Sequence, residues 1–109
     1  MTATAMTATA KKPVTLVNIL SVEPQKQQQL VDLLRQNTET VVKTLKGWIA
    51  TDLIASDDGK RVVIHSQWDN AADIEAMRAD PRMQAYFPKI KALASLDAIA
   101  GTVVMTDQR

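Results

Sequence analysis

The chain alternates between segments with the two-residue hydrophobic period of a strand and segments with the wider spacing of an amphipathic helix. Residues 15–22 are rich in β-branched and aliphatic side chains, and Glu23-Pro24 closes this run because the residue before a proline favours extended geometry. Residues 25–46 place leucine and valine at helical spacing and end at Gly47, a common helix stop. The pattern predicts a first strand over 15–22 and a long helix over 25–46.

The middle of the chain has the pattern of a hairpin. Residues 48–56 and 60–69 are rich in residues that favour strands, and they flank Asp57-Asp58-Gly59. The glycine can adopt the positive φ angle that a tight turn requires. We therefore expect two antiparallel strands joined at this turn.

A second helical region follows, and Asp80-Pro81 divides it, because a capping aspartate and a first-turn proline start a new helix. The later piece carries an apolar stripe over residues 82–95. Residues 96–106 then predict a fourth strand, which Gly101 weakens.

The order strand, helix, two strands, helix, strand predicts an α+β, ferredoxin-like split βαβ fold, with a four-stranded antiparallel sheet and the helices on one face. Both faces of the first strand are largely apolar. We expect the helices to cover the face with Asn18, and a second copy of the chain to cover the other face. The residues expected on that second face are Val17, Ile19, Val63 and His65. A homodimer is predicted because a bare apolar sheet face of this size favours aggregation.

Length and charge narrow the possible functions. The 109 residues suit one domain, which we place at 14–109 after a frayed segment over 1–13 that begins with MTATA twice. The formal net charge is +1 and the basic residues are scattered, which disfavours binding to nucleic acid. No apolar run is long enough to span a bilayer, so we expect a soluble, cytoplasmic protein with no membrane partner. With no cysteine and one histidine, the chain lacks the ligands of common zinc and iron–sulfur sites.

Asn18 is the first candidate for chemistry. It lies in the middle of an otherwise aliphatic face, where an amide without partners costs roughly 1–3 kcal/mol. It is either a structural amide that ties the first strand to a neighbour or a donor that points into a cavity under the helices. Spacing alone leaves both interpretations open.

The third strand contributes two further candidates, Trp68 and His65, which alternation places on opposite faces. Trp68 is either core filling or a pocket wall whose indole N–H reaches a substrate oxygen. His65 faces the expected partner sheet, where it pairs across the interface or, as a secondary candidate, acts as a base. The chain offers no evident pair of acid and base carboxylates.

The wall of such a pocket is expected to come from apolar residues near these candidates. Tyr86 and Phe87 have helical spacing with Met83, and they are either core or the lid of a cavity. The residues expected to line the pocket are Leu16, Ile64, Ser66, Ile74, Met77, Met83, Tyr86 and Phe87.

Four segments, in order, resemble one known family. They are VTLVNILSV, KGWIATDLIASDDGKRVVIHSQWDN, ADPRM and TVVMT. This combination resembles the antibiotic biosynthesis monooxygenase family of dimeric α+β barrels, and it covers nearly the whole chain after Pro13. The resemblance implies oxidation of an electron-rich phenolic, anthrone or quinol substrate to a quinone, with O2 as co-substrate and no metal, flavin or other cofactor.

The resemblance also bears on individual residues. Asn18 and Trp68 match an asparagine and a tryptophan that anthrone-oxidising relatives place in the pocket, where the amide and indole N–H groups hold the substrate oxygen as negative charge develops. Some relatives carry asparagine, tyrosine and arginine where this chain has Ile64, Ile74 and Phe87. The pocket implied here is therefore less polar.

Three alternatives remain on the same fold. A haem-degrading relative uses a helix histidine that the segment around Tyr86 lacks. A non-catalytic or stress-related dimer would bind small aromatics without oxidising them. An isomerase or decarboxylating relative would turn over its substrate without O2.

Overall fold

The computed structural model describes residues 13–109, and it has the predicted α+β architecture. The elements are β1 (Val14–Val22), η1 (Pro24–Lys26), α2 (Gln27–Thr40), η2 (Val42–Thr44), β2 (Trp48–Ala55), β3 (Arg61–Trp68), α3 (Ala71–Ala79), α4 (Pro81–Leu93) and β4 (Ala94–Gly101). The segment 1–13, predicted to be frayed, lies outside the described residues except for Pro13.

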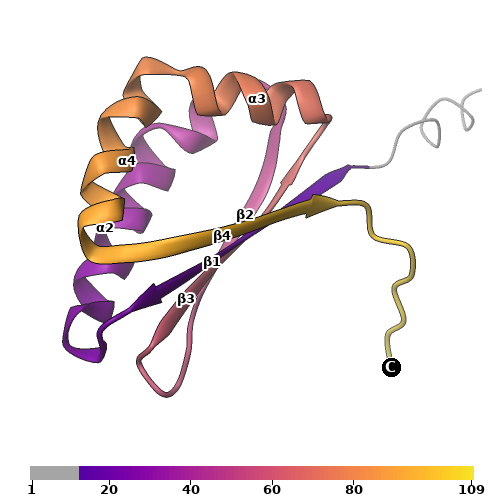
Figure 1. Ribbon diagram of the computed structural model, residues 1–109. Coiled ribbons are helices and arrows are strands. Elements are labelled where there is room, and N and C mark those ends of the chain that lie inside the picture. Colours follow the sequence, from indigo (N-terminus) through magenta and orange to yellow (C-terminus); the bar gives the residue numbers. More distant parts are fainter. Residues whose placement is uncertain (1–12) are drawn as a thin grey trace, which may run out of the picture.

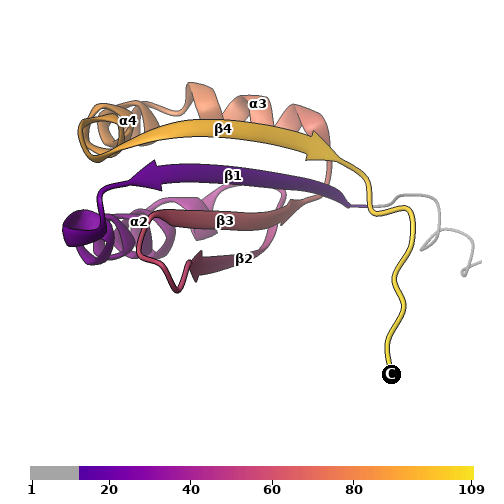
Figure 2. The same ribbon diagram turned by 60° about the horizontal axis from the view of Figure 1, so that its bottom comes forward.

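The four strands form one antiparallel sheet in the order β2-β3-β1-β4. Helices α2, α3 and α4 all lie on one face of this sheet, and no element of the described chain covers the other face (Figure 1). Turning the molecule brings the four strands into view side by side with the helices behind and above them (Figure 2). The predicted fold class is confirmed.

The register of β1 decides which side chains lie beneath the helices. Asn18 pairs with Ile64 of β3 on one side and with Ala98 of β4 on the other. Leu16 and Leu20, two positions before and after Asn18, are almost completely buried. Asn18 therefore projects from the helix-covered face, as the alternation of β1 predicts.

The first helix is shorter than its sequence pattern predicts. Residues 25–46 were expected to form one helix, but α2 ends at Thr40 and a separate 3-10 turn follows. The hydroxyls of Thr38 and Thr40 donate to the carbonyls of Leu34 and Gln36, four residues back. Such bonds compete with regular helix geometry, and the valines that follow also have low helix propensity.

The last strand is also displaced from its predicted range of 96–106. Helix α4 ends at Leu93, and β4 begins at Ala94 with no loop between them. It ends at Gly101, which pairs with Thr15, because β1 offers only one further strand residue at that end. The residues after Gly101 leave the body of the molecule (Figure 2).

Gly47 lies in the turn between η2 and β2, at a position that requires glycine. Its φ angle is +83°, and a Cβ placed there would collide with the carboxylate of Asp73 in the first turn of α3. The Gly47 carbonyl also accepts the backbone N–H of Asp69 at 2.8 Å. This turn therefore holds β2 against the junction of β3 and α3.

We predict that Gly47→Ala lowers the free energy of unfolding by more than the roughly 1–2 kcal/mol expected for the left-handed backbone alone, because Asp73 must also move. Urea unfolding measures the change. Gly101→Ala is the matched control, since nothing lies within 4 Å of a Cβ at that position. Equal stability of the two variants would contradict this account of the turn.

Candidate functional site

A cavity of about 290 Å³ lies between the sheet and the helix layer. This volume is near the lower end of the roughly 300–1,000 Å³ usual for small-molecule sites. The sheet lines it with Leu16, Asn18, Leu20, Thr51, Ile64, Ser66, Trp68, Leu96 and Ala98. The helical side lines it with Leu34, Asn37, Thr38, Val42, Met77, Arg78, Met83, Gln84, Phe87, Ile90 and Lys91.

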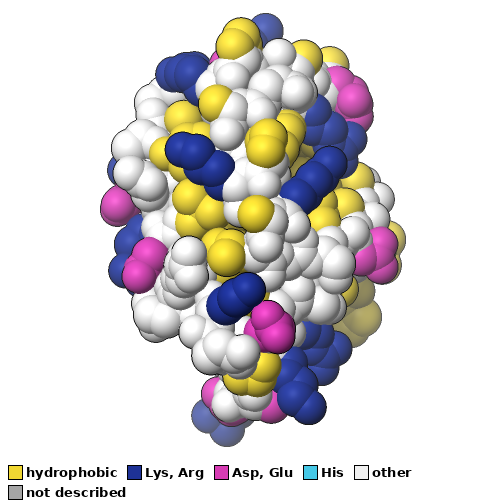
Figure 3. All heavy atoms as spheres, turned by 60° about the vertical axis from the view of Figure 1, so that its left-hand side comes forward, with side chains coloured by type: hydrophobic (Ala, Val, Ile, Leu, Met, Phe, Trp, Pro, Cys, Tyr) yellow, Lys and Arg dark blue, Asp and Glu magenta, His cyan; other side chains and the backbone are white. Residues whose placement is uncertain are grey.

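The cavity opens to solvent where its lining residues are exposed, between α3, α4 and the edge strand β4. These exposed residues are Arg78, Gln84, Lys91, Leu96 and Ala98. Figure 3 looks onto the side of the molecule formed by α2 and α4, where apolar side chains lie between lysine and arginine side chains. This helix-covered side combines apolar surface with positive charge.

Most of the residues expected at a site lie together in this lining. They are Leu16, Asn18, Ile64, Ser66, Trp68, Met77, Met83 and Phe87. Three others lie elsewhere, namely His65, Ile74 and Tyr86. The structure thus gathers the sheet candidates that share the Asn18 face.

Ile74 and Tyr86 were expected in the pocket wall, and each has a different environment. Ile74 is buried in the core cluster that contains Trp68. The Tyr86 hydroxyl lies 3.3 Å from Thr40 Oγ1, and the Lys89 ammonium lies 5.5 Å from the centre of the Tyr86 ring. Phe87 belongs to the lining of the cavity, whereas Tyr86, its neighbour on α4, packs against both core clusters.

Asn18 lies in the floor of the cavity and is partly buried. Within residues 13–109 its side-chain amide has no hydrogen-bond partner. The interpretation of Asn18 as a tie between strands therefore finds no bond to support it. Its N–H and C=O groups are available to a molecule in the cavity.

Trp68 is 1% exposed and its indole N–H already has a partner. The N–H donates to Ser66 Oγ at 3.1 Å, and Ser66 Oγ donates to the Leu16 carbonyl at 3.4 Å. Trp68 is opposite Val14, four residues along β1 from Asn18, or roughly 13 Å. Trp68 and Asn18 therefore line different ends of the floor.

Asn37 is a cavity residue that the sequence reasoning missed. It lies on α2 and is 5% exposed, and its Nδ2 donates to Met83 Sδ at 3.3 Å. A signal was present, because positions 30, 34, 37 and 41 share one helical face and the other three are Leu30, Leu34 and Val41. A polar residue in that stripe is as unusual as Asn18 in its strand.

The charged groups of the lining are both cations. Arg78 forms an ion pair with Glu75 at 2.7 Å, and Lys91 lies at the mouth. Neither a carboxylate nor a histidine belongs to the lining. The positive charges of Arg78 and Lys91 both favour a negative charge on a bound molecule.

The carboxyls whose pKa is shifted lie away from the cavity. A hydrogen bond from the Lys60 backbone, with help from Ser56, lowers the pKa of Asp58. The side chain and backbone of Arg82 lower the pKa of Asp80, the cap of α4. These shifts reflect a turn and a helix cap rather than acid–base chemistry.

His65 projects from the open face of the sheet. Its Nδ1 lies 3.7 Å from Asp52 Oδ2, and the two side chains are 40% and 76% exposed. In the described chain His65 is therefore separated from the cavity by the sheet itself.

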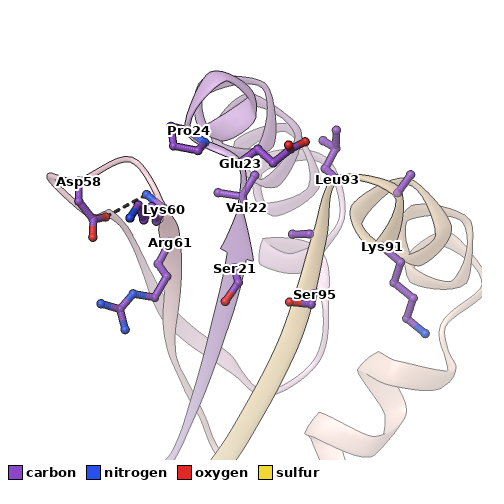
Figure 4. A pocket seen from close by; sticks show the side chains of 12 residues that line it. Ser21, Val22, Glu23, Pro24, Asp58, Lys60, Arg61, Lys91, Leu93 and Ser95 are labelled. Atoms are coloured by element: carbon purple, nitrogen blue, oxygen red, sulfur yellow. Dashed lines mark hydrogen bonds between the residues drawn. The ribbon is translucent and has the colours of Figure 1, made fainter.

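A second hollow, about 810 Å³ and largely open to solvent, lies where β1 ends beside the β2–β3 turn and the start of β4. Figure 4 shows that the charged ends of Glu23, Arg61 and Lys91 point in different directions there. Asp58 accepts a backbone hydrogen bond from Lys60 at 2.9 Å. This hollow lacks convergent polar groups, which a specific ligand site requires.

Within residues 13–109, no three His, Cys, Asp or Glu side chains come together as a metal site would require. No helix in that range is long and apolar enough to cross a membrane.

Residues 13–89 match the family model described as antibiotic biosynthesis monooxygenase. The chain is 40% identical over 80 residues to tetracenomycin-F1 monooxygenase of Streptomyces glaucescens, and the match covers 73% of this chain and 71% of that protein.

Two solved structures show the same fold. The ActVA-Orf6 monooxygenase of Streptomyces coelicolor, solved in complex with the ligand nanaomycin D, has a TM-score of 0.82 at 22% identity, covering 90% of this chain and 93% of that one. SnoaB, a cofactor-independent oxygenase from Streptomyces nogalater, has a TM-score of 0.74 at 18% identity, covering 87% and 96%. The predicted family and the predicted enzyme class, a monooxygenase, are confirmed. By its matched residues and by its curated relative, the chain belongs to the antibiotic biosynthesis monooxygenase family.

Proposed function

We propose that the protein oxidises an electron-rich phenolic, anthrone or quinol aromatic to a quinone with O2, without a metal or organic cofactor. The observation that carries this proposal is the Asn18 amide, which has no hydrogen-bond partner within residues 13–109 and lies in the floor of a mainly apolar cavity with cations at its mouth. SnoaB, described as a cofactor-independent oxygenase, and ActVA-Orf6, solved with nanaomycin D, support it by their shared fold.

The cavity's contribution begins with binding. Apolar side chains such as Leu16, Ile64 and Phe87 suit the faces of a planar ring system. The N–H of Asn18 donates to the ring oxygen, and this bond strengthens as the oxygen becomes an anion. Arg78 and Lys91 favour the same anion, which offsets part of the cost of placing its charge in an apolar cavity.

The oxidation then balances with O2 alone. An anthrone that has lost a proton is an enolate, which transfers one electron to O2. The resulting radical and superoxide combine at the ring carbon to form a peroxide anion, which takes up a proton to replace the one lost and becomes a hydroperoxide. Loss of water from this hydroperoxide leaves the new carbonyl, so one oxygen atom of O2 enters the ring and the other leaves as water. The protein binds, orients and shields the anion.

Trp68 has a different part in this proposal. Its ring lines one end of the cavity floor, and its N–H donates to Ser66 Oγ. A substrate oxygen at that end competes with Ser66 for the indole N–H. His65 lies on the opposite face of the sheet, and we assign it no contact with the substrate.

We predict that Asn18→Ala and Trp68→Phe each lower kcat for oxidation of 1,8-dihydroxy-9-anthrone at least about tenfold, or about 1.4 kcal/mol of transition-state stabilisation. O2 uptake and quinone absorbance measure turnover, with a chelator present and no flavin added. His65→Ala is the control and retains most of the activity.

Several outcomes would contradict the proposal. Loss of activity in His65→Ala with full activity in Asn18→Ala would place the site on the other face. Quinone formation that requires added metal or flavin would overturn the cofactor-free reaction. Aromatic binding without O2 uptake would favour the non-catalytic alternative, and turnover under nitrogen would favour an isomerase or decarboxylase.

We also propose that the open sheet face pairs with a second copy of the chain, giving a homodimer. Val17, Ile19 and Val63 lie on this face with Ile54 and Ile99, which are 52% and 61% exposed. Contiguous apolar surface of this kind marks an interface, and twofold pairing is the commonest assembly.

We predict that light scattering gives twice the chain's mass at micromolar concentration, and that Ile99→Glu shifts the protein to monomer because it places charge in the interface. Ala76→Glu, on the exposed surface of α3, is the matched control and stays dimeric. A monomeric parent protein would refute this assembly.

A further inference from the structure

Asn37 occupies a position on α2 where packing alone favours an apolar residue. The face it shares carries Leu30, Leu34 and Val41, all buried. Asn37 is itself 5% exposed and lies in the helical wall of the cavity. Leucine is close to asparagine in reach and would continue the stripe.

The hydrogen bonding of Asn37 is poor for so buried an amide. Its Nδ2 donates to Met83 Sδ at 3.3 Å, and a thioether is a weak acceptor. No nitrogen or oxygen atom within residues 13–109 is bonded to its side chain. A buried amide is costly without such partners. Packing within residues 13–109 therefore does not explain an amide at position 37.

Asn37 and Asn18 lie on facing walls of the same cavity, one in the helix layer and one in the sheet. Each amide carries both a donor and an acceptor, and neither is bonded to another nitrogen or oxygen of the described chain. The residues around them are mostly apolar. A ring that spans the cavity from one wall to the other, with an oxygen at each end, would meet one amide at each oxygen.

We propose that Asn37 is a positioning and specificity-determining residue, which hydrogen-bonds a second oxygen of the substrate ring on the edge opposite the oxygen bound by Asn18. This inference rests on the function proposed above, because it requires the aromatic ring to occupy this cavity. It assigns rings that carry oxygens at opposite ends, as a para-quinol does before oxidation and as an anthrone does once its new carbonyl has formed.

An amide suits this position better than a hydroxyl or a charged group. A quinol hydroxyl donates a hydrogen bond, whereas the carbonyl of the quinone only accepts one. The C=O of Asn37 accepts the hydrogen bond of the quinol hydroxyl, and after a rotation of the side chain its N–H donates to the quinone carbonyl. The same residue therefore fits a quinol before oxidation and a quinone after it.

The test compares two bicyclic ligands that need no turnover, 1,4-naphthoquinone with two opposite oxygens and 1-tetralone with one. Calorimetry gives the Kd of each for the parent protein, for Asn37→Leu and for Gln36→Leu, an exposed neighbour on α2. We expect Asn37→Leu to weaken naphthoquinone binding about tenfold and tetralone binding by less than about twofold, because tetralone still has Asn18 for its one oxygen. Gln36→Leu is expected to change neither Kd.

Thermal unfolding of the same variants separates this role from a structural one. We expect Asn37→Leu to keep or raise the Tm, since it removes a poorly bonded buried amide. A lower Tm with unchanged ligand binding would show that Asn37 serves the fold and overturn the inference. Equal weakening of both ligands, or no binding of either to the parent protein, would also overturn it.

The outcomes distinguish this inference from the proposed function. If the parent protein oxidises anthrone while Asn37→Leu treats both ligands alike, the inference about Asn37 fails alone. If the selective loss of naphthoquinone binding appears but no anthrone is oxidised, the two-amide recognition stands and the proposed oxidation fails.

Discussion

The pairing of β1 on both of its edges is the constraint on which the rest of the molecule depends. β1 is hydrogen-bonded to β3 and to β4 over nearly its whole length. A slip of one residue in either register would turn every side chain of β1 to the other face. Leu16 and Leu20 would then leave the core, so their burial fixes the direction of Asn18 between them. The register of β1 therefore determines both the burial of the core leucines and the position of Asn18 in the cavity floor.

The helix layer completes the cavity because its second region is divided. Asp80 caps α4 through a hydrogen bond from the Arg82 N–H at 2.8 Å, so α3 and α4 run as separate short helices. Met77 from the first and Phe87 from the second both reach the cavity. The mainly apolar lining with few polar groups is what the proposed function requires of a site that binds an aromatic ring.

Local patterns in the sequence predict much of this arrangement. The two-residue period of β1 and β3 predicts that Asn18 and Trp68 share the helix-covered face, and Asp80-Pro81 predicts the break between α3 and α4. These features depend on neighbouring residues. The end of α2 at Thr40 was not predicted, because it depends on how threonine hydroxyls compete for backbone carbonyls.

Features that depend on side-chain rotamers or on contacts between distant residues were also beyond the sequence pattern. The bond from the Trp68 N–H to Ser66 depends on side-chain rotamers, and it leaves Trp68 less free than its position predicts. The contact of Asn37 with Met83 joins residues 46 positions apart. The end of β4 at Gly101 depends on where β1 begins. Tyr86 and Phe87 are neighbours in sequence, and only packing decides that Phe87 faces the cavity.

A crystal structure of the protein with a bound para-quinone tests the central claim most directly, because it locates the ring. The account predicts the quinone between the sheet and the helices, with one oxygen within about 2.7–3.2 Å of Asn18 Nδ2. A quinone bound on the open face of the sheet beside His65 would contradict it.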